Sequence, residues 1–544
     1  MSSTCHAAAL FGMGLPGVLD VIRALRRQRR TDISSMNPRQ IAPRQLALFS
    51  AGAFVFLYEH LFFSPTLPFW IGGDQSVYLV NATRMLHGEI MYRDFFHFLL
   101  PGTELVYLVF FALFGVREWV PNAVLIVLGL TLLGLTVAIS KNVLKGYAAF
   151  LPPLLFLTMA YRNMLNGTHH WFCTATILGA LAVAMPRRTP ARLAGAGILC
   201  GLAVDFTTFQ GMLVAFGFGV FLCLEGWGRE AVVVLGKKVL TLAASFLGSV
   251  MAANIYFAVR AAPGMFWYST VTFCMRYYRA DMDANSWRVY LAGWPSVPPW
   301  RHVPLFASWL LIYALLPMVY LIFLKLYARR ASTLEQEVWQ SLMLLSIIGL
   351  SMCVAVAPAP NFFRLFAISP PAFIVLVWML GEARCRKVLL GIFWTFGILL
   401  ALTEPWSNHR GWHGLLDFPS GVTAFVSQPQ YEKYYWMLHH TRPAEYFFAA
   451  CRLPDFYFPL QMRNPAQVPL LTTTDYTRPE QVQDVVESLE RYKVRLVYWS
   501  SNLDSPEDAS GAGDHLGPLR AYLLDHYHVI KTFSDDDSVW ERRE

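Results

Sequence analysis

The stretch GGDQSVYLVNATRMLHGEIMYRDFFHFLLP, residues 72–101, decides how the rest of the chain is interpreted. It follows the first long apolar segment and contains two carboxylates, Asp74 and Asp94, together with Glu89, arginines and histidines. Charge is scarce elsewhere, and acids held at the mouth of a membrane bundle cost free energy and usually mark a functional site. We therefore predict an active-site loop, with Asp74 and Asp94 as its catalytic residues.

The composition points to the membrane. Of the 544 residues, 55% are hydrophobic and only 15% are charged, and the mean hydropathy is +0.40. These values exclude an ordinary soluble domain. The net charge of +8 does not indicate nucleic acid, because Lys and Arg stand in short clusters between apolar runs, as they do in cytoplasmic loops. We expect membrane lipids, and no nucleic acid, among the partners.

Long apolar segments predict about eleven membrane-spanning helices. They are 46–63, 120–140, 147–161, 171–185, 192–204, 210–224, 238–259, 303–326, 338–357, 365–380 and 387–403. A twelfth candidate, 101–116, would be only about 24 Å long as a helix. If it does not cross, every basic loop lies on the side of the basic N-terminus, as the positive-inside rule requires. We therefore predict a juxtamembrane or re-entrant helix at the outer face.

This topology divides the chain into three parts. Residues 1–45 form a basic cytoplasmic segment, whose true start is either Met1 or Met36. Residues 46–403 form the membrane domain, with a first outer loop at 64–119. In 404–544, short apolar runs, such as 468–471, alternate with helical patterns, which predicts an extracytoplasmic α/β domain. The fold class is thus an α-helical polytopic membrane protein with a C-terminal α/β domain.

Each acid of the loop also has a plainer interpretation. In a helix beginning at Asp74, the steps of about 100° place Tyr78, Asn81 and Met85 on the same stripe. Asp74 follows two glycines, so it could instead serve only as the N-cap of that helix. Asp94 could form a structural ion pair with the adjacent Arg93, or a structural contact with His97.

Three motifs of the loop carry a resemblance to a known family. They are D-Q-x-x-Y from Asp74, A-x-R-x-L-x-G-E from Ala82, and Y-R-D-F-F from Tyr92, followed by a Pro-Gly pair. This pattern resembles the opening of the integral-membrane glycosyltransferases of the GT-C superfamily, which include protein O-mannosyltransferases, the lipid A aminoarabinose transferase and their bacterial relatives. A late outer turn, NFFRLFAISPP at 361–371, and the α/β tail resemble the family in layout.

The resemblance implies a hexosyl- or pentosyltransferase of the bacterial inner membrane. It would move a sugar, with inversion, from a polyprenyl-phosphate carrier to a lipid, glycan or protein acceptor at the outer face. Asp74 matches the acid that positions or deprotonates the acceptor, and Asp94 matches a second acid. Some relatives carry a further Asp after the third span, where this chain has Arg162, Asn163 and His169. No cofactor is implied with certainty, and a divalent metal stays open.

The leaving phosphate needs cations, because negative charge accumulates there in the transition state. Arg364 is the first candidate, since a guanidinium matches phosphate with two hydrogen bonds, and Arg93 and Arg276 are second choices. Arg364 could instead be an interfacial anchor. Tyr78, His97 and His169 complete the substrate-binding candidates. No residues have the spacing of a metal site.

Two rival functions belong to other classes. A transporter or flippase for a lipid-linked sugar predicts duplicated halves with broken spans, and no internal repeat is visible. A receptor or assembly subunit would leave the acid-rich loop unexplained. The position of Asp74 separates these hypotheses: an enclosed outer cavity favours a transferase, whereas open lipid or bulk solvent excludes it.

Overall fold

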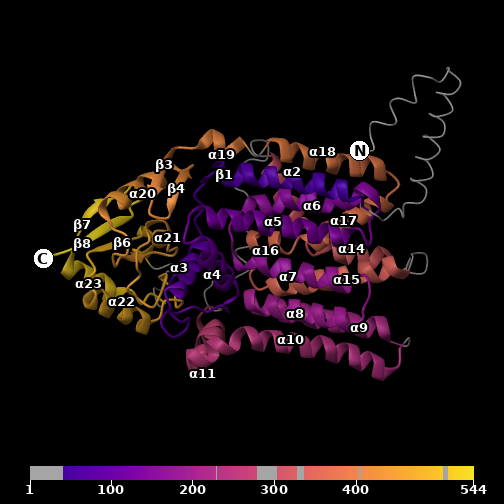
Figure 1. Cartoon of the computed structure of the whole chain (residues 1–544), viewed down its shortest axis with the longest axis horizontal. Helices are drawn as coiled ribbons and strands as arrows, with labels where there is room; N and C mark the ends of the chain where they lie inside the picture. The colour runs from indigo at the N-terminus through magenta and orange to yellow at the C-terminus, as the bar shows by residue number, and fades with distance from the viewer. Residues whose placement is uncertain (1–40, 228–229, 279–302, 328–335, 404–405, 506–512) are drawn as a thin grey trace, which may run out of the picture.

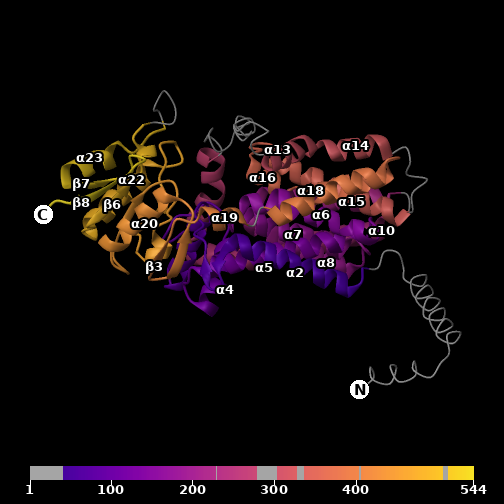
Figure 2. The ribbon, with the colours of Figure 1, turned by 90° about the horizontal axis from the view of Figure 1, so that it is seen from above.

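The computed structural model describes residues 41–544 except 228–229, 279–302, 328–335, 404–405 and 506–512. Most of the predicted N-terminal segment therefore lies outside the described residues. The molecule is elongated: a bundle of roughly parallel helices occupies one end and a part with both strands and helices occupies the other (Figures 1 and 2). The helices α3 (Gln75–Leu86) and α4 (Gly102–Phe114) lie between the two ends.

Each predicted apolar segment contains helix, but not each helix is long enough to count as a span. Five helices have the length and hydropathy to cross a membrane, and a sixth candidate is the bent pair α13 and α14 (Val303–Leu315 and Met318–Tyr327), all counted within the described ranges. The five are α5 (Trp119–Ser140), α9 (Thr208–Gly226), α10 (Val232–Arg260), α15 (Gln336–Val356) and α18 (Arg386–Thr403).

The remaining apolar segments form shorter or interrupted helices. Prolines at the first turn fix the start of several of them, and the segment 147–161 changes from α6 to a π-helical turn at Leu157–Tyr161. They include α6 (Leu151–Phe156), α7 (His169–Ala184), α8 (Pro190–Phe206), α16 (Phe362–Ala367) and α17 (Pro370–Glu382). The helix α2 (Pro43–Leu61) is as long as α9 but is not among the five, because its composition is less apolar.

Two glycines on α8 bring it close to α10. A Cβ at Gly197 would lie 2.5 Å from the Leu242 carbonyl oxygen, and one at Gly201 would lie 2.8 Å from that of Phe246. Small residues four positions apart allow helices to approach this closely in lipid, where packing drives association. This contact extends the bundle to its lower edge in Figure 1.

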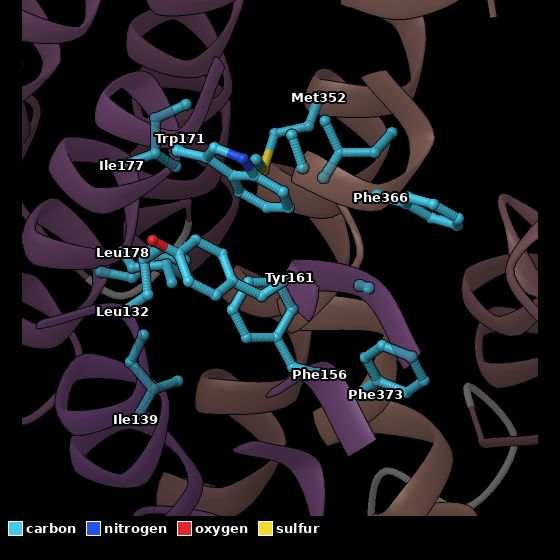
Figure 3. Packing of buried hydrophobic residues seen from close by; sticks show 14 of the residues in the cluster. Leu132, Ile139, Phe156, Tyr161, Trp171, Ile177, Leu178, Met352, Phe366 and Phe373 are labelled. Carbon is cyan, nitrogen blue, oxygen red and sulfur yellow. The ribbon is translucent and has the colours of Figure 1, made fainter. Parts of the chain in front are cut away.

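The centre of the bundle is an aromatic cluster that holds the third and fourth apolar segments together (Figure 3). Tyr161 packs edge-on against Trp171, with ring centroids 4.9 Å apart. Its hydroxyl donates to the Leu125 carbonyl (2.6 Å), and the Trp171 indole donates to the Met164 carbonyl (2.9 Å). Since both polar atoms are satisfied inside the core, the turn that follows Tyr161 is firmly placed.

The C-terminal part contains a hairpin and a mixed sheet. Strands β3 (Gly414–Phe418) and β4 (Gly421–Phe425) form the hairpin. The sheet has the order β5-β6-β8-β7, with β5 and β6 parallel and the other pairs antiparallel. Its strands are β5 (Phe448–Ala450), β6 (Leu496–Trp499), β7 (Tyr527–Thr532) and β8 (Ser538–Arg542).

The described residues of this part form five helices, of which the three longest pack against the strands through buried side chains. They are α19 (Trp406–Gly411), α20 (Gln428–His440), α21 (Tyr457–Leu460), α22 (Pro479–Arg491) and α23 (Gly517–His526). The apolar run 468–471 is not a strand: its Val468 and Leu471 are buried against other side chains, and the run packs as irregular chain. The apolar pattern of residues 468–471 therefore results from the burial of their side chains and not from pairing in a sheet.

The first loop is tied to the C-terminal part by backbone contacts. A short hairpin, β1 (Phe62–Ser64) and β2 (Leu67–Pro68), leads into it. The Trp70 amide then donates to the Ala424 carbonyl (2.8 Å), and the Phe96 amide donates to the Gln467 carbonyl (2.9 Å). The loop and the C-terminal residues therefore build one surface together.

Candidate active site

Asp74 stands at the N-cap position of α3, yet its side chain makes no capping hydrogen bond, and its backbone is helical (φ −54°, ψ −27°). The cap comes from elsewhere: Asn166 accepts a hydrogen bond from the Gln75 amide (3.1 Å) and donates to the Gly72 carbonyl (3.0 Å). Gly73 allows this approach, since it has φ +97° and a Cβ there would lie 2.4 Å from the Asn166 amide nitrogen. The Asp74 carboxylate is thus free for another role.

The Asp74 carboxylate lies on the wall of a cavity of about 500 Å³, which is lined by residues from widely separated segments. Five predicted site residues lie on its wall: Asp74, Tyr78, His97, His169 and Arg364. The side chain of Asp74 is exposed, and its exposed surface faces this cavity. Burial by the surrounding protein raises the pKa of Asp74, while Arg452 and Arg364 act to lower it.

Arg364 is held on the cavity wall by the N-terminus of α16. Asn361 caps that helix by accepting from the Arg364 amide (3.1 Å). The guanidinium donates to the Ala359 carbonyl (3.0 Å) and to the Tyr278 hydroxyl (3.1 Å). These bonds orient the cation without neutralising it, so it can still attract an anion in the cavity.

A series of contacts between polar side chains leads from the cavity wall into the protein. Tyr78 is hydrogen-bonded to Nδ1 of His169, and its ring meets that of His97 edge-on at 5.9 Å. Nε2 of His97 lies 3.0 Å from Oε1 of the fully buried Glu104, which also accepts from Asn81 (3.2 Å). Burial raises the pKa of Glu104 to about 8 and lowers that of His97 to about 3. Burial thus disfavours the charged form of each of these two side chains.

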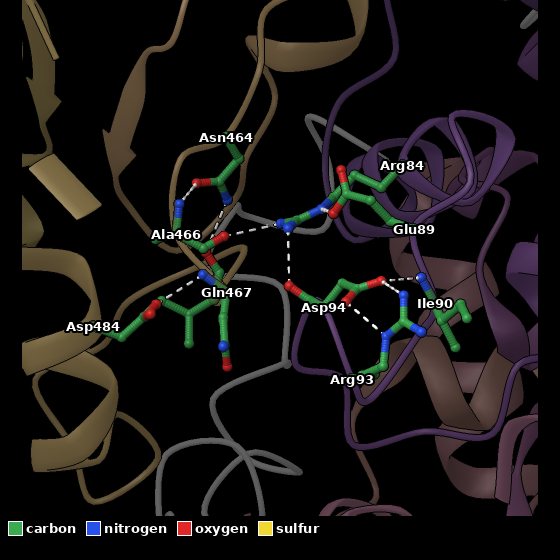
Figure 4. Close-up of polar contacts among 10 residues, drawn as sticks. Arg84, Glu89, Ile90, Arg93, Asp94, Asn464, Ala466, Gln467 and Asp484 are labelled. Atoms are coloured by element: carbon green, nitrogen blue, oxygen red, sulfur yellow. Dashed lines mark hydrogen bonds and ion pairs between the residues drawn. The ribbon is translucent and has the colours of Figure 1, made fainter. Parts of the chain in front are cut away.

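Three predicted site residues do not reach this cavity. The Asp94 carboxylate accepts from the Arg93 guanidinium (2.8 and 2.7 Å) and from the Ile90 amide (2.7 Å), as Figure 4 shows. Arg93 lowers the pKa of Asp94. Both residues line a different cleft, because the chain turns between them and His97. Arg276 lies on the π-helical turn Cys274–Tyr278 and is exposed, and it is the neighbouring Tyr278 that lines the cavity.

The structure adds two residues that the sequence did not suggest. Arg452 lines the cavity from the loop after β5. Asp455, in the same loop, accepts from the Gly73 amide (3.2 Å) and the Ser76 hydroxyl. Burial, together with the smaller effect of the nearby Asp74 charge, raises the pKa of Asp455 to about 7. The only signal was R-L-P-D in a tail otherwise poor in motifs, and nothing local connects it to a loop 382 positions earlier.

In the part of the chain that is described, His, Cys, Asp and Glu side chains form no group of three or more that could hold a metal ion.

This chain resembles known proteins in its structure. No family model matches the sequence, and no curated protein matches it. ArnT from Cupriavidus metallidurans bound to undecaprenyl phosphate has 13% identity and a TM-score of 0.59, over 92% of this chain and 98% of that one. Its apo state gives a TM-score of 0.53 at 13% identity, over 91% and 97%.

A second solved structure is the oligosaccharyltransferase AglB from Archaeoglobus fulgidus in complex with an inhibitory peptide and a dolichol-phosphate. It has 12% identity and a TM-score of 0.51, over 90% of this chain and 74% of that one. At such identities the likeness concerns the fold, and it extends over nearly the whole chain. The chain therefore has the same overall fold as ArnT and AglB.

Proposed function

We propose that this protein transfers a sugar from a polyprenyl-phosphate donor to an acceptor at the outer face of the membrane, with inversion. One observation carries the proposal: Asp74 exposes its carboxylate to a cavity that also contains the cations of Arg364 and Arg452. A base and two cations on one cavity are what such a transfer needs. ArnT, of similar fold, was solved with undecaprenyl phosphate bound.

In this mechanism Asp74 takes the proton from an acceptor hydroxyl or amine as that atom attacks the anomeric carbon. The bond from the anomeric carbon to the phosphate oxygen breaks on the opposite face, so the configuration inverts, and the electron pair leaves with the carrier phosphate. Arg364 and Arg452 stabilise the charge that develops on the phosphate. Because burial raises the pKa of Asp74, its carboxylate is a stronger base than an exposed one.

Aromatic side chains give the cavity a flat wall for the sugar. Phe98 packs against Tyr278 with ring centroids 4.6 Å apart, and Tyr476 meets Phe98 edge-on at 5.7 Å. Such faces suit the C–H side of a pyranose or furanose ring. His169, oriented by Tyr78, supplies a neutral hydrogen-bonding group on the same wall.

The proposal includes the topology that the basic loops favour: about eleven spans, a cytoplasmic N-terminus and an extracytoplasmic 404–544 in a bacterial inner membrane. In that topology the Asp74 cavity opens on the outer side. A reporter fused at Arg188, in the loop between α7 and α8, should then read cytoplasmic. An external reading would mean that 101–116 crosses the membrane. A reporter fused at Arg330, in another basic loop, should also read cytoplasmic, and this residue lies outside the described residues.

The function is tested by supplying donors. Purified protein in detergent is incubated with a panel of polyprenyl-phosphate hexoses and pentoses plus crude acceptor lipid, and released polyprenyl phosphate is measured. We expect release with at least one donor by the wild type and none by Asp74→Asn. Equal release by both proteins, or movement of the intact donor across proteoliposomes without release, would overturn the proposal, and the second result would favour a flippase.

A further inference from the structure

A second and larger hollow, of about 840 Å³, lies between the first loop and the C-terminal part. It begins at the C-terminal end of α3, whereas Asp74 is at the N-terminal end. A helix of this length extends about 18 Å, so the two hollows are separate places. We call this one the loop cleft. Its volume is within the range of ligand-binding sites, and the proposed transfer uses none of its residues.

The walls of the loop cleft are joined by hydrogen bonds that need no ligand (Figure 4). Arg84 donates to the Glu89 carboxylate (2.7 Å), to the Ala466 carbonyl (3.0 Å) and to the Asp94 carbonyl (3.2 Å). On the opposite wall Asp484 accepts from the Gln467 amide (2.8 Å). The cleft is thus preorganised, and preorganisation reduces the entropy cost of binding.

Among the described residues that line the cleft, the charged side chains without an ion pair are mainly positive. Arg84 is paired with Glu89, and Arg93 is paired with Asp94, so these charges cancel. Arg463 and Arg491 also line the cleft and are exposed. Neither guanidinium has an ion pair with any residue of the described ranges. Among the described residues that line the cleft, Asp484 is the acid without an ion pair, and Arg491 acts on its carboxyl electrostatically.

A pair of aromatic rings lies beside these cations. Tyr446 and Tyr492 are stacked with ring centroids 4.2 Å apart and planes 30° apart, and both line the loop cleft. Tyr492 is 39% exposed. Large amphipathic rings with free edges and hydroxyl groups bind ligands that combine an apolar face with polar groups. Sugar rings have this combination.

We propose that the loop cleft binds an acidic saccharide, that is, a sugar carrying a carboxylate or phosphate group. Arg463 and Arg491 contact the anion, and the Tyr446–Tyr492 pair contacts the ring. The site's role as a holding place for an extended acceptor rests on the proposed function, but the binding itself does not. Because the cleft is at the far end of α3 from Asp74, it anchors the ligand without taking part in bond breaking.

The test measures equilibrium binding to the full chain in neutral detergent, with trigalacturonate as the acidic probe and maltotriose as the neutral one. We expect trigalacturonate to bind at least about tenfold more tightly, as two charge-assisted contacts require, and less tightly at high salt. Undetectable binding of the acidic probe, or equal binding of the two probes, would overturn the proposal.

Substitutions of arginines show where on the protein trigalacturonate binds. Arg463→Gln with Arg491→Gln should weaken trigalacturonate binding at least about tenfold, whereas the matched control Arg543→Gln, at an exposed arginine outside the cleft, should not change it. If Arg364→Gln removes the binding and the double variant does not, the probe occupies the Asp74 cavity and the proposal is wrong. Transfer activity is measured separately with Asp74→Asn, so failure of the catalytic proposal leaves this result intact.

Discussion

Asp74 and Asp94 belong to one loop and have opposite surroundings. Asp74 has no hydrogen-bond or ion-pair partner for its carboxylate within the described residues, it faces a cavity, and burial raises its pKa. Asp94 is held by Arg93 and by the Ile90 amide, and Arg93 lowers its pKa. Within the described residues the Asp74 carboxylate is left without such contacts, whereas the Asp94 carboxylate helps to hold the shape of the loop.

The difference comes from which residues satisfy the backbone nearby. At Asp74 a distant residue, Asn166, caps the helix, so the local acid is not needed there. At Asp94 the acid itself binds the local amide. Similar sequence contexts can therefore give a reactive group and a structural one, and the tertiary partner decides between them. The four predictions below test this contrast, from the largest expected effect to the smallest.

Asp74→Asn should reduce turnover by about 10²–10⁴-fold, the usual contribution of a general base. Its stability at neutral pH should not fall, because the fold disfavours the ionised Asp74 and Asn cannot ionise. Donor-dependent kinetics and thermal unfolding measure the two effects. Activity that stays proportional to the amount of folded protein would place Asp74 among the structural residues.

Arg364→Ala should lower kcat/KM by roughly ten- to a hundredfold, through the loss of one charge-assisted contact to the phosphate. Arg364→Lys should lose less, since it keeps the charge but not the two-pronged geometry. The matched control is Arg93→Ala, which removes a guanidinium paired with Asp94 and should leave kcat unchanged within about twofold. Equal losses for Arg364→Ala and Arg93→Ala would erase the distinction between the two regions.

The pH dependence should respond to Arg452 and not to Arg93. Asp74 acts in its ionised form, so activity rises as pH rises through its pKa. Arg452 lowers that pKa, and Arg452→Gln should therefore move the acid limb of kcat/KM upward, by up to about one pH unit. The pH at the midpoint of the acid limb can be measured even if Arg452→Gln also lowers the maximal kcat/KM. A limb that moves downward or stays in place would separate Arg452 from Asp74.

Asp94→Asn should cost about 0.5–1 kcal/mol of stability at neutral pH, as expected for an exposed ion pair and one hydrogen bond. Since the pKa of Asp94 is lowered in the folded protein, its stabilisation is present above the unfolded pKa and is lost as pH falls through the folded one. The difference in unfolding temperature from wild type should thus disappear in acid. A large fall in kcat per folded molecule would return Asp94 to the catalytic candidates.

Local patterns predicted the elements better than they predicted the contacts. Hydropathy located helical segments through the bundle, and periodicity located α22 and α23 in the tail. It could not tell that 468–471 is buried irregular chain, because burial alone produces the same run of apolar residues. Nor could it establish how many helices cross the membrane, since the described helices α7, α8 and α17 are short.

The candidate site was predictable where its residues stand in polar stretches between apolar runs. Asp74 was predicted from the acid-rich loop and the family resemblance, and Arg364 from the match of a guanidinium to phosphate. With the substrate-binding candidates Tyr78, His97 and His169 they meet at one cavity, although their roles stay predictions. Asp94 pairs with the adjacent arginine and lines the loop cleft instead, and its catalytic role also stays a prediction. Arg452 and Asp455 were missed because only the folded chain brings their loop to α3.

The contact of Asp455 with Gly73 and Ser76 also concerns how the protein is made. The loop that carries Asp74 is synthesised early, and the residue that fixes its backbone follows 382 positions later. At ordinary rates of translation this interval is roughly 20–80 s. The backbone around Asp74 therefore lacks these contacts until Asp455 has been synthesised, and a chain truncated before Asp455 never forms them.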